Sequence, residues 1–309
     1  MLTHENSILL LEILKNKNMK TKILLLAVFI ISIAMKSDKP AYILFDSKGK
    51  ATKYEKLIKT AAEADIVFFG ELHNNPICHW LQLQITKDLF EIKKEMLVLG
   101  AEMFESDNQL LLTEYVTGQI TKKSFERQAR LWPNYKTDYK PLVEFAKDND
   151  LEFIATNIPR RYASVVHKGG FEALDSLSDE AKNYYPPLPI MYDPGLDCYK
   201  NMMGMGGMSG MGKSKPNPNF PKAQAVKDAT MAYFILKNWS EGVTFLHYNG
   251  SYHSDNHESI VWYLKQVNPE LKILTITSIQ QEDIKKLDEE YFDQADFIIC
   301  IPEDMTTTY

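Results

Sequence analysis

Short apolar runs alternate with longer amphipathic segments along most of this chain. The runs, which we predict to be strands, lie at residues 41–45, 66–69, 96–101, 152–155, 243–247, 271–277 and 297–301. Short apolar runs bounded by turn-forming or charged residues are typical of strands buried on both faces of a sheet. Between the runs, apolar residues recur at helical spacing, as Tyr54, Leu57 and Ile58 do, which predicts helices there.

Predicted helices separate most of the predicted strands. They span residues 52–64, 76–94, 107–117, 122–131, 140–148, 222–239 and 254–265. Strands that alternate with helices favour parallel pairing through right-handed crossovers. The predicted fold class is therefore α/β, with a mostly parallel sheet flanked by helices on both faces. At the start of the last helix, Asp255 and Glu258 are placed like a capping box.

Two segments depart from this alternation within a domain that we place at residues 36–309. Residues 107–149 hold three successive helices, which predicts a small helical subdomain inserted between two strands. Residues 184–221 are rich in Pro, Gly and Met. Glycine at such density does not order readily, and long segments without regular structure are usually functional or disordered. We therefore expect a flexible loop there.

The N-terminal residues 1–35 have the pattern of an export signal. Met19 opens an alternative start followed by two lysines, and an apolar stretch then runs from Ile23 to Ala34 and ends in small residues. These features characterise a secretory signal, and the stretch is shorter than the ~20 residues that a spanning helix needs. We expect export to the periplasm or cell envelope. No cysteine lies near the expected cleavage point, so the sequence does not support a lipid anchor.

Composition narrows the function further. The chain is 45% hydrophobic with a net charge of −6, and it lacks the clustered basic face that nucleic-acid binders usually show. Its three cysteines, Cys78, Cys198 and Cys300, can form at most one disulfide, and no CxxC pair suggests redox work.

Charged and imidazole side chains follow several predicted strands. Glu71 and His73 follow the strand at 66–69, Glu102 follows the strand at 96–101, and His253 follows the strand at 243–247. In open α/β sheets, ligands bind beyond the carboxyl ends of the strands. We therefore expect these four side chains to meet at one edge of the sheet.

The two histidines carry the more specific part of this pattern. His73 and His253 each follow a glycine by three residues, so two GxxH elements stand at equivalent strand exits. Glu71 or Glu102 taken singly could equally cap a helix or lie in solvent. Glu102 stands out because it interrupts an apolar run, and a buried carboxylate needs a partner charge, a metal or a hydrogen-bond donor.

Other basic residues have plainer interpretations. Arg160 and Arg161 follow a proline at a predicted helix start, where they can hold an anionic ligand or form ordinary salt bridges. His79 and His257 are predicted to be surface residues. His247 continues a strand, and we interpret it as a residue that contacts the ligating side chains rather than the ligand itself.

These motifs resemble those of the ChaN-like haem-binding uptake proteins of the Tiki/TraB-like superfamily. The matching residues are 67–76, 101–105, 132–133 and 247–253. The resemblance implies haem binding at the cell envelope by a protein whose homodimer can enclose stacked haems. It also implies a tyrosine iron ligand, for which Tyr192 and Tyr199 are the candidates. The alternative for each is a loop aromatic that anchors its segment.

Two functions therefore stand side by side. The first is a non-enzymatic haem-binding protein of haem and iron uptake, dimeric when loaded, with outer-membrane uptake machinery as a partner. The second is a metal-dependent hydrolase of amide or ester bonds. In it, His73 and His253 hold a divalent metal, and Glu71 or Glu102 is a further ligand or the base. A scaffold without a small ligand leaves the convergent charges unexplained.

Overall fold

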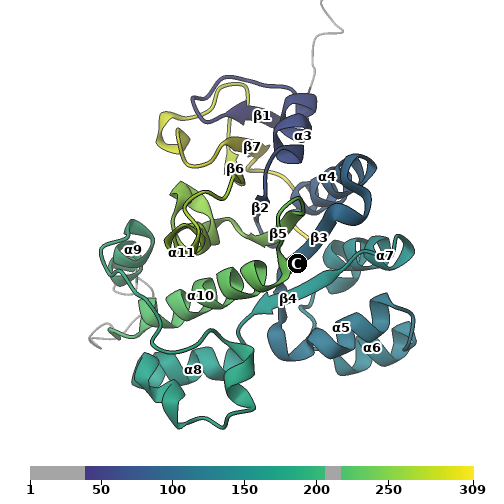
Figure 1. The fold of residues 1–309 in the computed structure, drawn as a ribbon. Coiled ribbons are helices and arrows are strands. Elements are labelled where there is room, and N and C mark those ends of the chain that lie inside the picture. Colours follow the sequence, from purple (N-terminus) through teal and green to yellow (C-terminus); the bar gives the residue numbers. More distant parts are fainter. Residues whose placement is uncertain (1–38, 206–216) are drawn as a thin grey trace, which may run out of the picture. The chain divides into compact units, whose positions relative to one another are not determined.

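Seven strands form one sheet in the order β1-β7-β6-β2-β5-β3-β4 (Figure 1). This computed structural model describes residues 39–205 and 217–309, and residues 42–309 form one unit. The strands are β1 Ile43–Asp46, β2 Ile66–Glu71, β3 Leu97–Glu105, β4 Phe153–Asn157, β5 Thr244–Gly250, β6 Ile273–Gln281 and β7 Phe297–Pro302. All neighbours pair in parallel except β1 and β7. The predicted α/β class is confirmed.

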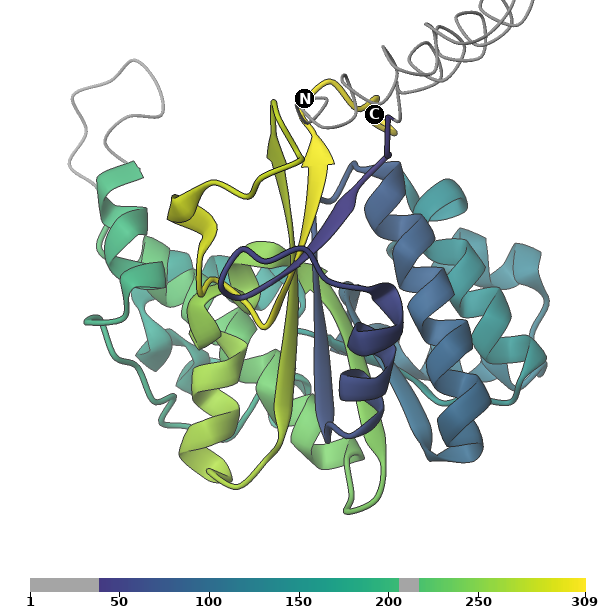
Figure 2. The same cartoon turned by 90° about the horizontal axis from the view of Figure 1, so that it is seen from above.

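Helices cover both faces of the sheet. They are α3 Tyr54–Ala62, α4 Pro76–Lys93, α5 Gln109–Val116, α6 Lys122–Gln128, α7 Lys140–Asp148, α8 Arg160–Gly169, α9 Asp197–Met205, α10 Phe220–Asn238 and α11 Ile260–Val267. One hydrophobic core lies between one face of the sheet and the helices from α3 through α7. A second hydrophobic core lies between the other face and helices α10 and α11. Figure 2 shows α3 and α4 on the side of the sheet opposite α11.

The central strands are buried because helices remove both their faces from water. All six residues of β2 are buried. The chain then turns sharply into α4, where the Asn75 side chain accepts hydrogen bonds from the backbone of Ile77 (2.9 Å) and Cys78 (3.3 Å). Pro76 stands in the first turn, where its missing N–H costs nothing. This turn carries the first GxxH element.

The structure corrects the predicted start of one helix. Residues 254–259 do not belong to α11, which begins at Ile260. Glu258 therefore does not complete a capping box in its own helix. Its carboxylate instead accepts from the backbone N–H groups of Asp197 (3.1 Å) and Cys198 (2.7 Å). These N–H groups belong to the first turn of α9 and lack partners within that helix.

The segment predicted to be a flexible loop, 184–221, contains α9. Residues 206–216, which hold four of its six glycines, lie outside the described residues. Within the described residues, no helix combines the length and the apolar character that crossing a membrane would require. Cys78, Cys198 and Cys300 are buried and free.

The outer edge of β4 is occupied by a side chain. Gln109, at the start of α5, donates its amide N–H to the carbonyl oxygen of Phe153 (3.0 Å). Its amide oxygen accepts from the backbone N–H of Ala155 (2.6 Å). One glutamine thus makes the hydrogen bonds that a further strand would otherwise make with this part of β4.

Candidate functional site

Three adjacent strands deliver the site residues to one edge of the sheet. The order β2-β5-β3 places Glu71, the last residue of β2, opposite Gly250, the last residue of β5. Glu102 lies in the neighbouring β3. His73 and His253 follow directly after β2 and β5. These side chains form two linked groups, one around each histidine.

The first group surrounds His73. Its Nδ1 donates to Glu71 Oε1 at 2.9 Å. The Tyr139 hydroxyl and the Gln82 amide also donate to the buried Glu71 carboxylate. The Trp132 ring meets the His73 ring edge-on at 4.9 Å between centroids. The His73 side chain nevertheless remains 40% exposed, so a ligand can reach its outer edge.

The second group surrounds His253 and is buried. His253 Nε2 lies 3.2 Å from Glu102 Oε1, and its Nδ1 contacts Asp228 Oδ1. The second Asp228 oxygen accepts from the Tyr199 hydroxyl at 2.8 Å. Asp228 and Tyr199 come from α10 and α9. The imidazole is therefore fixed by carboxylates at both nitrogens.

Gly250 joins the two groups. Its backbone N–H donates to Glu102 Oε2 at 2.8 Å. A Cβ atom at this position would lie 2.8 Å from both Cε1 and Nε2 of His73, closer than side-chain atoms normally approach. The glycine is thus required because the His73 ring packs directly against the backbone at the end of β5.

Charge pairing sets the protonation of the buried group. Burial alone would raise the pKa of the Glu102 carboxyl, but the neighbouring His253 outweighs it and holds this pKa well below its usual range. Burial alone would lower the pKa of His253, yet Glu102 and Asp228 together raise it to about 10. At neutral pH, His253 is therefore a cation enclosed by carboxylates.

The same competition acts at the exposed group. Burial opposes the charged form of Glu71, but its hydrogen bond from His73 and the nearby His79 lower its pKa. Burial likewise opposes the cationic form of His73, and the hydrogen bond to Glu71 together with the charge of Glu102 raises its pKa. Within the described residues, no hydrogen bond reaches His73 Nε2. This nitrogen is available to a ligand or to a proton in transfer.

The four predicted metal ligands, Glu71, His73, Glu102 and His253, do lie together at the site. They pair with one another, however, and both nitrogens of His253 face carboxylates. Within residues 39–205 and 217–309, no group of three or more His, Cys, Asp or Glu side chains is arranged to hold a metal ion. Metal ligation by these four residues stays a prediction.

The predicted haem-binding residues form two groups, because the two tyrosines pack against each other and the two arginines begin α8. Tyr199 is buried and engaged with Asp228, whereas Tyr192 is half-buried and packs on Phe171 and Tyr199, with ring centroids 5.6 and 5.4 Å away. Arg161 forms an ion pair with Asp107, the ordinary salt bridge that was its alternative interpretation.

Arg160 is exposed, and within the described residues no ion pair involves it. It begins α8, and Phe171 lies beyond the end of that helix. Ten helical residues span about 15 Å. Arg160 and the ring that Tyr192 contacts are therefore separated by roughly the length of α8. Haem contact by Arg160 or Arg161 remains a prediction.

Several site residues escaped the sequence analysis. His79 was expected at the surface but is buried, and its ring nitrogens lie 3.0 Å from Gln82 Oε1 and 3.5 Å from Asp138 Oδ2. Asp228 and Tyr139 were not singled out. For Asp228 a signal existed, because it is the only acidic residue of the predicted helix 222–239.

Comparisons with known proteins agree with this architecture. Residues 57–264 match the family model described as haem-binding uptake, Tiki superfamily, ChaN. The fold is similar to the structure titled cofacial heme binding to ChaN of Campylobacter jejuni, with a TM-score of 0.61, 16% identity, and coverage of 84% of this chain and 96% of that one. A succinoglycan biosynthesis protein gives a TM-score of 0.49 at 11% identity, covering 85% and 94% of the two chains.

A curated relative is the chloroplastic protein RETICULATA-RELATED 5 of Arabidopsis thaliana. It is 26% identical over 204 residues, which cover 63% of this chain and 27% of the relative. This chain therefore spans only about a quarter of that protein's length. The likeness to the Campylobacter jejuni structure, at 16% identity, shows the fold alone.

Proposed function

Because this chain belongs to the ChaN family of haem-binding uptake proteins in the Tiki superfamily, we propose that it binds haem and acts in haem and iron uptake at the cell envelope. The observation that carries the proposal is the family match over residues 57–264. That span includes both histidine groups and the segment that holds Tyr192 and Tyr199.

Tyr192 is the tyrosine better placed to meet iron. Its ring is half-buried among aromatic side chains, and within the described residues no hydrogen bond engages its hydroxyl. Burial raises the pKa of the Tyr192 phenol, so the free protein carries the neutral form at neutral pH. A phenolate suits ferric haem iron, and coordination would release the proton. Tyr199 would first have to leave Asp228.

A titration with ferric haem, followed at the Soret band, tests the proposal. We expect a saturable shift that is lost or strongly weakened in Tyr192→Phe. Tyr291→Phe is the matched control and should bind as the parent does, because Tyr291 is a half-buried tyrosine packed in the core beside β1 and β7. If the parent protein gives no Soret shift, or if Tyr192→Phe and Tyr199→Phe together leave the spectrum unchanged, the proposal fails.

The proposed uptake role includes export and assembly. The signal pattern over residues 1–35 supports a location in the periplasm or cell envelope, where outer-membrane uptake machinery would be a partner. A homodimer formed on loading would enclose haem between two copies. Fractionation of expressing cells tests the location. Light scattering with and without haem tests the dimer, and an unchanged mass on loading would contradict it.

A second candidate function is hydrolysis of an amide or ester bond. It is favoured by one specific observation, the half-exposed His73 held by Glu71 and facing the Glu102–His253 pair across Gly250. His73 would take a proton from the attacking water while Glu71 orients the ring. This proton transfer needs no metal ion. Metal ligation by the four side chains, which pair with one another within the described residues, stays a separate prediction.

Turnover of p-nitrophenyl acetate and of an anilide tests the second function. It should be lost by about 10² to 10⁴-fold in His73→Asn and retained in His167→Asn, which alters an exposed histidine. Assays with added Zn²⁺ and with a chelator show whether metal contributes. Equal rates for the two variants would exclude a catalytic His73.

A further inference from the structure

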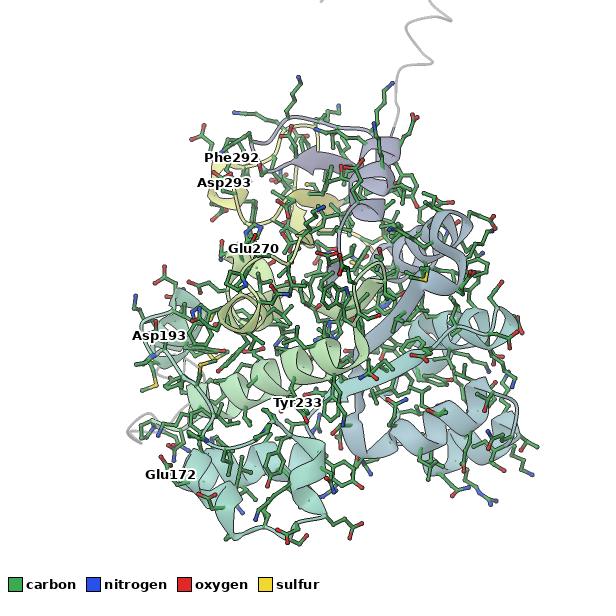
Figure 3. All side chains as sticks on the ribbon, viewed as in Figure 1. Glu172, Asp193, Tyr233, Glu270, Phe292 and Asp293 are labelled. Carbon is green, nitrogen blue, oxygen red and sulfur yellow. The ribbon has the colours of Figure 1, made fainter. Side chains whose placement is uncertain are left out.

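We propose that the groove between α10, α11 and residues 186–191 binds an apolar molecule that carries a carboxylate. The groove has a volume of about 470 Å³, within the range of small-ligand sites. Tyr233 of α10, which is labelled in Figure 3, is one of its lining residues. The proposal goes beyond haem uptake because it needs neither Tyr192 nor the strand-end histidines.

The walls of the groove are apolar and partly exposed. Ala229 and Ala232 of α10 form a floor that small side chains leave open. Met191 of the 186–191 segment and Val267 of α11 also line the groove and are 49% and 64% exposed. An apolar body in the groove would cover these side chains and gain about 25 cal/mol for each Å² removed from water.

A hydrogen bond fixes the shape of the groove. The Tyr263 hydroxyl of α11 donates to the backbone carbonyl of Met191 at 2.8 Å. This bond ties the proline-rich segment to the helix, so the two walls are held at a set separation. The groove is therefore formed before a ligand arrives, which reduces the entropic cost of binding.

One cation stands at the rim. Lys237 Nζ lies 5.8 Å from the Tyr233 ring centroid and 5.7 Å from that of Phe234. Within the described residues, several other lysines form ion pairs with carboxylates, but Lys237 forms none. Cation–π contacts hold an ammonium without neutralising it. An apolar groove with one unpaired cation at its rim therefore suits a ligand that has an apolar chain or ring and a carboxylate at one end.

Two sources of this chemistry exist, a free fatty acid and the propionate-bearing edge of haem. The fluorescent fatty acid cis-parinarate is the probe, with laurate, dodecanol and ferric haem as competitors. We expect saturable parinarate binding and competition by laurate. Competition by haem as well would assign the groove to haem, and competition by laurate alone would assign it to fatty acids.

Variants separate the head from the body of the ligand. Lys237→Gln should weaken laurate about three- to fivefold, the effect of one exposed ion pair, and leave dodecanol unchanged. The matched control is Lys222→Gln, which alters a lysine of the same helix that also lies over an aromatic ring, 5.8 Å from Phe171, outside the groove. If the two changes weaken laurate binding equally, Lys237 does not bind the carboxylate.

The groove itself is tested by filling it. Ala232→Phe should weaken parinarate by more than tenfold, and Val267→Asp, at an exposed position that tolerates charge, should weaken laurate more than dodecanol. The proposal is overturned if parinarate does not bind the parent protein, or if it binds both variants as tightly as the parent. A Soret shift that survives both variants leaves the proposed haem function intact, so the two ideas fail separately.

Discussion

His73 and His253 hold equivalent places in the sequence and very different places in the molecule. Each follows a glycine by three residues just after a parallel strand. His253 is closed at both ring nitrogens by carboxylates, whereas His73 is held at one nitrogen and remains 40% exposed. The motif therefore determines where the backbone turns, and residues from other elements determine what the imidazole can do.

Because of this difference in exposure, the two histidines have different roles in the site. His253 is a fixed cation that neutralises buried charge, and exchanging its proton would disrupt the ion pairs around it. His73 is oriented by Glu71 and Trp132 but keeps one nitrogen available. Changes to the two groups should therefore have unequal consequences.

Asp228→Ala should be the most damaging change. It leaves His253 without one carboxylate and Tyr199 without its acceptor, deep inside the protein. Breaking a buried pair typically costs about 3–5 kcal/mol. Urea unfolding measures the loss, with Asp179→Ala at a fully exposed pair as the control, expected within about 0.5 kcal/mol of the parent. Similar values for both variants would mean that the buried pair contributes little.

The stability supplied by His253 should depend on pH in a defined direction. Glu102 and Asp228 overcome the effect of burial and raise its pKa to about 10, above the ordinary value of about 6.5. Its contribution is therefore complete below about pH 6.5 and is lost as the pH rises through 10. Imidazole ¹⁵N shifts followed from pH 6 to 11 test this, and a transition near 6.5 would contradict it.

Gly250→Ala should disturb the contact between the two groups. The added Cβ would meet the His73 ring at 2.8 Å, and overpacking usually costs about 1–3 kcal/mol. In a His73→Ala background, the same change should cost clearly less, because the clashing ring is gone. If Gly250→Ala lowers the free energy of unfolding equally in both backgrounds, the glycine is required by the backbone and not by the His73 ring.

Tyr139→Phe should have the smallest effect. It removes one of the donors to Glu71, and such a hydrogen bond to a buried carboxylate contributes about 1–3 kcal/mol. Because His73 and Gln82 still donate to Glu71, we expect about 1 kcal/mol in urea unfolding. Tyr135→Phe is the control, since this buried tyrosine of the same segment makes no side-chain hydrogen bond within the described residues. A cost no larger than that of the control would contradict the role of Tyr139.

The sequence predicts the beginnings of strands better than their ends. Apolar runs locate the strands because both faces are covered, but β3 continues to Glu105 and β5 to Gly250, beyond the predicted ends at residues 101 and 247. Polar residues such as Glu102 resemble strand ends. They stay in the sheet because charged partners from elsewhere satisfy them.

The same limit applies to the site. Glu71, His73, Glu102 and His253 were predicted together because parallel strands must end at a common edge. Asp228 and Tyr139 reach that edge from α10 and the turn before α7, and how these segments cross the sheet depends on distant packing. His79 was misplaced at the surface for the same reason, since the Asp138 it contacts is remote in sequence.

The glutamine at the border of β4 has a consequence for self-association. Because Gln109 already occupies the Phe153 carbonyl and the Ala155 amide, a second molecule cannot lengthen the sheet there by adding a strand in register. Chains at high concentration are thereby protected from growing into ribbons along this border. A dimer of this chain would therefore not form by strand addition at this border.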